Sequence, residues 1–164
     1  RMALEELLVE FGITRVSEEA KADLNLAWHR LDPWPDAPSG LTRLKAKFII
    51  AAMSNGNAAL ITNMAKYAGL PWDCILGAEP AQAYKPDPKT YLTGVELLSL
   101  VPEQVMMVAS HHDDLFAAAA QGLKTAFVCR PNEFGPTKTA DLEMDPSFDI
   151  GAVDFRDLAS QMGV

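Results

Sequence analysis

Three clusters of polar residues in this sequence have residue types that could together form a binding or catalytic site for an anionic ligand. Ser54, Asn55 and Gly56 form the first cluster. Its glycine allows a tight turn, and a helix that starts next would present free N–H groups to an anion. The second cluster contains Lys85, whose ammonium group could neutralise a carboxylate. Both have ordinary alternatives, because Ser and Asn often cap helices and most lysines are simply exposed.

The third cluster contains His111, His112, Asp113 and Asp114, directly after Ser110. These side chains are of metal-binding types, but neighbouring residues on an extended segment point to opposite sides and cannot all hold one ion. We therefore predict no metal site, although His111 and Asp114 could face the same way. The alternative for Asp114 is that it caps a helix.

Short apolar segments alternate with amphipathic ones after residue 47, which predicts strands alternating with helices. This order implies an α/β fold with a doubly wound parallel sheet, in which ligands bind beyond the carboxyl ends of the strands. The three polar clusters follow predicted strands and should therefore converge. Predicted strands cover residues 48–53, 74–76, 105–109, 125–128 and 148–150, and predicted helices cover residues 57–68, 88–98, 114–121 and 153–159.

Residues 1–32 have the pattern of two amphipathic helices, the second with Ser17 as its N-cap. Three prolines within residues 32–38 cannot continue a helix. We therefore predict a helical subdomain with its linker at residues 1–38, and an α/β core at residues 39–164.

The second of these helices should continue to Leu31 and use Trp28 on its apolar face. We also expect Trp34 in the linker to be packed against apolar neighbours. His29 should lie on the surface of the second helix.

Composition and charge restrict the partners. The chain has 164 residues, of which 49% are hydrophobic and 22% charged, as in a globular domain. Its net charge of −8 repels nucleic acid and anionic membrane surfaces, so we predict neither as a partner. The apolar runs are too short to span a bilayer. Two widely separated cysteines, Cys74 and Cys129, predict reduced thiols and a cytoplasmic location.

In this order the clusters resemble motifs II, III and IV of the haloacid dehalogenase-like (HAD) hydrolase superfamily, and most closely those of its (S)-2-haloacid dehalogenase branch. Residues 31–36 also resemble that branch's hinge between a helical cap and a Rossmann-like core. The resemblance covers residues 1–131. It implies that residues 1–38 are part of a cap, that the substrate is a small 2-haloacid, and that no cofactor is needed. It also leads us to expect a homodimer. The segments that carry it are residues 53–57, 85–91 and 108–115, with Gly122.

The resemblance assigns substrate-binding roles to Ser54, Asn55 and Gly56, and it places Tyr91 among the catalytic residues. Ser54 and Asn55, on the turn made by Gly56, would bind the substrate carboxylate. Tyr91 keeps the family's spacing from the lysine of the second cluster and would help to position the substrate. Its ordinary alternative is a tyrosine of the hydrophobic core.

The resemblance also implies a covalent mechanism. An aspartate attacks the carbon that bears the halogen and expels halide, and water then hydrolyses the ester to a 2-hydroxy acid. Lys85 would pair with the nucleophilic aspartate, and Asp114 would orient the water. His111 occupies the position at which the family has a polar active-site residue.

One departure from the superfamily bears on the chemistry. Its Mg²⁺-dependent phosphatases carry an aspartate four residues before the aspartate that corresponds to Asp114, and here that position is Ser110. A neutral hydroxyl replaces a carboxylate poorly as a ligand of Mg²⁺. The resemblance therefore favours the metal-free dehalogenases over the alternative, a Mg²⁺-dependent phosphatase.

A second departure concerns the nucleophile. In the family it lies in an Asp-x-x-Gly-Thr-like motif after the first strand, ahead of the cap, and no apolar run of this sequence is followed by that motif. The sequence begins at Arg1 within a helical pattern, so we expect a piece of a longer protein whose core lacks its first strand. Such a piece would be inactive alone. A catalytically inactive fragment or a binding module is thus a further alternative.

Overall fold

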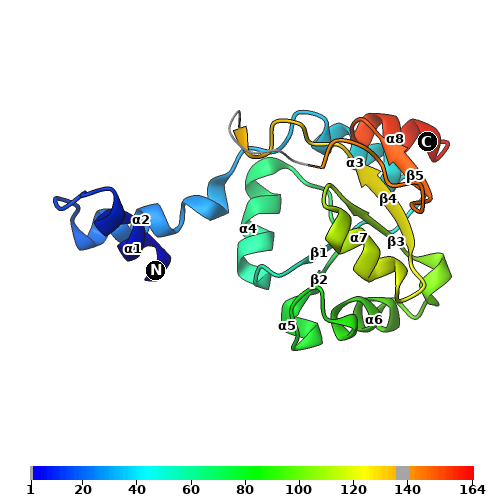
Figure 1. Ribbon diagram of the computed structural model, residues 1–164, viewed down its shortest axis with the longest axis horizontal. Helices are drawn as coiled ribbons and strands as arrows, with labels where there is room; N and C mark the ends of the chain where they lie inside the picture. The colour runs from blue at the N-terminus through cyan, green and yellow to red at the C-terminus, as the bar shows by residue number, and fades with distance from the viewer. Residues whose placement is uncertain (1, 136–140) are drawn as a thin grey trace.

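The computed structural model describes residues 2–135 and 141–164, and it has the parallel α/β fold that the sequence predicts (Figure 1). All five predicted strands are present: β1 (Ala51–Ser54), β2 (Cys74–Gly77), β3 (Met106–Ala109), β4 (Lys124–Val128) and β5 (Ile150–Ala152). The bounds of β2, β3 and β4 agree with the prediction to within one residue at either end, whereas β1 begins three residues later than predicted and β5 is shifted by two residues. The helices are α1 (Met2–Glu10), α2 (Glu18–Asn25), the 3₁₀ helix η1 (Ala27–Arg30), α3 (Ala37–Lys45), α4 (Ala58–Ala68), α5 (Ala78–Ala81), α6 (Pro88–Leu97), the 3₁₀ helix η2 (Pro102–Gln104), α7 (His112–Ala119) and α8 (Phe155–Gln161).

The strands form two separate parallel sheets. In one, β1 pairs with β2, with Ser54 opposite Gly77 at their carboxyl ends. In the other, β4 lies between β3 and β5. Within the described ranges β1 and β3 therefore each have one backbone-paired neighbour, and each keeps one edge free.

The larger sheet carries helices on both faces. Strand β4 turns Ala126 and Val128 to a core that it shares with α3 and α8, and it turns Phe127 to a second core with α6 and α7. This alternation is the two-residue period of a strand, and it places one apolar layer on each face. The expectation of a doubly wound sheet is thereby confirmed for β3, β4 and β5.

Helix α3 is absent from the sequence prediction, which treated residues 32–38 as linker and began a strand at Phe48. Prolines suggested an irregular segment, yet Pro38 lies in the first turn of α3, where its missing N–H costs nothing. Gly40 of α3 approaches α8 so closely that a Cβ there would lie 2.5 Å from Cβ of Phe155. Because α3 extends to Lys45, the first strand begins only at Ala51.

The N-terminal helices also differ from expectation. The second helix ends at Asn25 instead of continuing to Leu31, and η1 follows it as a separate turn beside α4 (Figure 1). Trp28, expected on the apolar face of a helix, and Trp34, expected to pack against apolar neighbours, are 66% and 41% exposed. His29 was expected on the surface, but it is half-buried and its Nδ1 lies 2.8 Å from Nδ2 of Asn63. Among the described helices, none is long and apolar enough to cross a membrane.

Candidate active site

Lys85 and Asp114, from the second and third polar clusters, form an ion pair. Nζ of Lys85 donates to Oδ2 of Asp114 at 2.6 Å, and each side chain is 17% exposed. Lys85 lies in the loop before α6, and Asp114 lies in the first turn of α7. The predicted helix start at Asp114 is wrong by two residues: His111 occupies the N-cap position, so Asp114 is inside the helix and its carboxylate is free for other partners.

Tyr91 of α6 completes this group from the core side. Its hydroxyl donates to Oδ1 of Asp114 at 2.6 Å, and the residue is fully buried. Burial, followed by the hydrogen bond to Asp114, raises the pKa of Tyr91 well above its ordinary value. The phenol therefore stays protonated and remains a donor. Each oxygen of Asp114 thus receives one hydrogen bond, which fixes the plane of the carboxylate.

Asn55 connects the first polar cluster to the second. Its Nδ2 donates to the backbone oxygen of Lys85 at 3.1 Å, and its Oδ1 accepts from the backbone nitrogen of Lys85 at 2.7 Å. This reciprocal pair ties the end of β1 to the loop that carries Lys85. The side chain that was expected to bind a substrate carboxylate therefore holds Lys85 in place.

The turn after β1 satisfies some of its own donors. Gly56 N–H donates to Oγ of Ser54 at 3.0 Å, and Asn57 caps α4 by accepting from the N–H of Leu60. A carboxylate oxygen of Glu79 accepts from the N–H of Ala58 at 2.6 Å. Two of the N–H groups expected to be free for an anion at this helix end are therefore occupied. None of the described residues accepts a hydrogen bond from the Ser54 hydroxyl, so its hydrogen can be donated to a ligand.

His111 belongs to a different group of contacts. Its Nε2 lies 3.0 Å from each carboxylate oxygen of Glu133, and Oγ of Ser110 donates to the same carboxylate at 3.3 Å. The His111 ring stacks on Phe134, with ring centroids 6.1 Å apart. The structure therefore brings Lys85, Tyr91 and Asp114 together but places the His111 side chain with Glu133.

Glu133 is a candidate site residue that the sequence analysis missed, because it lies in an acidic loop without periodicity. His112 is bound elsewhere: its Nε2 lies 2.9 Å from the backbone oxygen of Glu143, and its ring packs among Phe127 and Phe148. Within the part of the chain that the structure describes, no three His, Cys, Asp or Glu side chains are grouped so that they could hold a metal ion.

A second missed feature is a buried ion pair between Asp36 and Arg130. Nη1 and Nη2 of Arg130 donate to the two oxygens of Asp36 at 2.9 and 2.8 Å. Burial opposes the ionisation of Asp36, but hydrogen bonds from Arg130 and from the N–H of Phe155 outweigh it and lower the pKa of Asp36 below its usual value. The partners are 94 residues apart in the sequence, and no local sequence pattern indicates that they pair.

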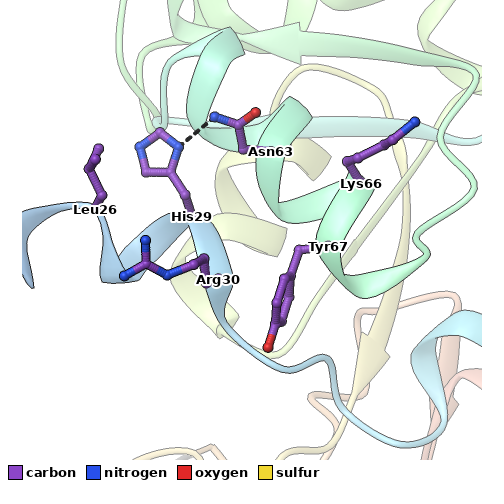
Figure 2. Close-up of a pocket in the computed structure, with 6 residues that line it drawn as sticks. All are labelled: Leu26, His29, Arg30, Asn63, Lys66 and Tyr67. Carbon is purple, nitrogen blue, oxygen red and sulfur yellow. Dashed lines mark hydrogen bonds between the residues drawn. The ribbon is translucent and has the colours of Figure 1, made fainter. Parts of the chain in front are cut away.

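A hollow of about 430 Å³ lies between η1 and α4, away from this chemistry (Figure 2). It is bridged by the hydrogen bond between His29 and Asn63, which joins the two elements. None of the predicted site residues lines it, so it marks the contact between the N-terminal helices and the core. The lining residues are Leu26, His29, Arg30, Asn63, Lys66 and Tyr67.

We expect Tyr91→Phe to lower the free energy of unfolding by about 1–3 kcal/mol at pH 7, because Asp114 loses a donor inside the fold. In the wild-type chain, Tyr91 is protonated in both states below about pH 10, but above that pH it ionises only when unfolded. The wild type should therefore lose stability as the pH rises past 10. The difference in free energy of unfolding between the wild type and Tyr91→Phe should become smaller.

Urea unfolding between pH 7 and pH 11 measures this difference. Tyr84→Phe is the matched control, since Tyr84 is 69% exposed, and we expect it to leave the stability unchanged. An advantage of the wild type over Tyr91→Phe that stayed constant up to pH 11 would contradict the burial of a protonated phenol.

Comparison with known proteins gives a consistent assignment. The family model of the haloacid dehalogenase-like hydrolases matches residues 1–122. The (S)-2-haloacid dehalogenase 4A of Burkholderia cepacia is 34% identical over 126 residues, which are 72% of this chain and 54% of that protein. The chain therefore spans about half the length of the curated relatives that it matches.

Two solved structures are still more similar. A crystal structure of an L-2-haloacid dehalogenase is 46% identical, with a TM-score of 0.94, over 98% of this chain and 70% of that one. A second, described as a defluorinating L-2-haloacid dehalogenase, is 48% identical, with a TM-score of 0.93, over 98% of this chain and 66% of that one. From its motifs, its fold and these relatives, the chain belongs to the haloacid dehalogenase-like hydrolase family.

Proposed function

We propose that the protein carrying this chain hydrolyses the carbon–halogen bond of 2-haloalkanoic acids and releases a 2-hydroxy acid and halide. The observation that carries this proposal is the group made by Lys85, Tyr91 and Asp114. It fixes one carboxylate and one ammonium group next to each other at the carboxyl ends of the strands, where ligands bind in such folds. The relatives named above support the same reaction.

Lys85 is suited to serve a second carboxylate in addition to Asp114. An ammonium group has three donors, and Asp114 takes one of them. A nucleophilic aspartate beside Lys85 would stay ionised, because the positive charge favours the carboxylate form. We assign to Lys85 the role of holding that nucleophile, and to Asn55 the role of holding the Lys85 backbone.

Asp114 is the group proposed to act on water. In the first step a carboxylate oxygen of the nucleophile bonds to C2 of the substrate, and halide leaves with the electron pair of the broken bond. In the second step water attacks the carbonyl carbon of the ester, and Asp114 accepts its proton. The bond between the carbonyl carbon and the substrate-derived oxygen then breaks, and Asp114 returns the proton to that oxygen. The 2-hydroxy acid leaves, and the nucleophile returns to its carboxylate form.

The two sheets leave a place for the strand that would carry the nucleophile. β1 and β3 each keep an edge without a backbone partner in the described ranges, and a strand between two parallel edges would satisfy both. We propose that the strand carrying the nucleophile lies there. In the same way we propose that residues 1–38 are part of a helical cap and that residues 39–164 form the core.

In this proposal the first polar cluster, at the turn after β1, binds the substrate. Ser54 has a hydroxyl hydrogen available for the substrate carboxylate, and Gly56 gives the turn that presents it. We also propose a cytoplasmic location, which the free thiols of Cys74 and Cys129 support, and a homodimer, as the resemblance suggests.

The experiment is halide release from racemic 2-chloropropionate by the full-length protein in EDTA, with 2-fluoropropionate in parallel because one relative is defluorinating. Release that stops at half of the racemate supports a stereospecific dehalogenase that needs no metal. No halide release, combined with Mg²⁺-dependent hydrolysis of p-nitrophenyl phosphate, would replace the proposal by the phosphatase. Absence of both activities would favour a non-catalytic relative.

A further inference from the structure

The linker between η1 and α3 is fastened to the core by an unusually complete set of contacts. The guanidinium group of Arg130 binds both carboxylate oxygens of Asp36, and the two side chains are 10% and 9% exposed. Oδ2 of Asp36 also accepts from the N–H of Phe155 at 2.8 Å, at the start of α8. A planar guanidinium that binds a carboxylate in this two-pronged way fixes distance and orientation together.

Aromatic contacts add to this fastening. The guanidinium carbon of Arg130 lies 5.0 Å from the ring centre of Trp34 and 5.4 Å from that of Phe155, so the cation is held between two rings. Arg156 donates to the backbone oxygen of Pro35 at 2.8 Å. Three consecutive linker residues are therefore each held by a residue from the end of β4 or the start of α8.

The position of Arg130 connects this linker to the candidate site. Arg130 lies two residues beyond the end of β4, at the same sheet edge as the loop that follows β3. Three residues further along the same loop, Glu133 binds Ser110 and His111. A movement of Arg130 would therefore shift both the linker and the loop that holds His111.

We propose that Arg130 is a positioning residue: with Asp36 and Trp34 it fixes the linker against the carboxyl edge of the sheet, and so sets where the N-terminal helices stand relative to the candidate site. The part that concerns catalysis rests on the proposed function. α1 and α2 are joined to the core through η1 and this linker (Figure 1), so the linker acts together with the contact between η1 and α4 in setting their placement.

The first test follows Trp34 in this chain. With Trp28 and Trp72 replaced by Phe, Trp34 is the remaining tryptophan, and acrylamide quenching measures its access to solvent. Arg130→Met should raise the quenching constant about twofold, because the guanidinium no longer covers the ring. The double variant D36N/R130M should regain most of the stability that either single variant loses, since no lone charge stays buried, but its quenching should remain raised.

The second test uses 2-chloropropionate turnover by the full-length protein. Arg130→Met and the double variant should both raise KM about tenfold or more, because the site is displaced. A variant that only lost stability would lower the amount of active enzyme without changing KM. Lys124→Met is the matched control: it removes an ion pair with Asp149 at the opposite end of β4, and KM should stay at the wild-type value.

Unchanged quenching of Trp34 in both Arg130 variants would overturn the anchoring of the linker. Raised quenching with a wild-type KM in the double variant would overturn the positioning role and leave a purely structural ion pair. If the wild-type full-length protein releases no halide, the proposed function fails, and the quenching result still decides whether Arg130 anchors the linker.

Discussion

Replacing Lys85 by Ala is expected to abolish halide release by the full-length protein, with a loss of about 10³-fold or more in kcat/KM. The ammonium group of Lys85 lies 2.6 Å from Asp114, and both side chains are largely shielded from water. Without it, two carboxylates would face each other without a cation between them, and the nucleophile would be driven toward its neutral, unreactive form. The defect should therefore lie in the first chemical step.

Halide release under single-turnover conditions measures that step directly. Lys89→Ala is the matched control, because Lys89 lies on the same stretch of chain but is exposed, and we expect wild-type rates from it. Circular dichroism should show that the Lys85→Ala variant keeps its fold. Halide release at the wild-type rate by the Lys85→Ala variant would remove Lys85 from the mechanism and leave the assignment of this site without support.

The sequence was most informative where local pattern and topology agree. Proline and a capping residue predicted the start of α6 at Pro88, and apolar runs predicted β2, β3 and β4 within one residue at either end. Because parallel strands end at one edge, the clusters that follow them were expected to converge. The contacts of Lys85 with Asn55 and with Asp114 are those that this argument could anticipate.

The sequence was least informative about contacts between distant segments. The pairing of Asp36 with Arg130 depends on how α3, β4 and α8 pack, and nothing within a short window of sequence encodes it. Glu133 was overlooked for the same reason, since only the folded loop brings it to His111. Periodicity likewise predicted an apolar face that includes Trp28, but it could not say that this face stays exposed in the chain.

Replacing Asp114 by Asn should separate the two halves of the proposed reaction. Expulsion of halide needs the nucleophile and Lys85, whereas hydrolysis of the ester needs a carboxylate that can take a proton from water, which an amide cannot do. Steady-state turnover should fall by about 10²–10⁴-fold. The first turnover should still release halide, so we expect about one equivalent of halide per site and then a stop.

Halide stoichiometry and intact-protein mass test this together. After mixing with 2-chloropropionate, the Asp114→Asn variant should carry one substrate-derived 1-carboxyethyl group, attached through an ester to the nucleophilic aspartate, and alkaline treatment should remove it. Asp113→Asn is the control, because Asp113 is exposed and adjacent, and we expect repeated turnover from it. Repeated turnover by the Asp114→Asn variant would mean that another group accepts the proton from the hydrolytic water.

The combination of the two variants is more informative than either one. A loss in Lys85→Ala without any ester, together with an ester that persists in Asp114→Asn, would assign the two partners of one 2.6 Å ion pair to successive steps. Loss of the first halide in both variants would instead mean that the pair acts as a unit before the carbon–halogen bond breaks. In that case Asp114 serves to hold Lys85 in place, and the hydrolytic water must be bound by a different side chain.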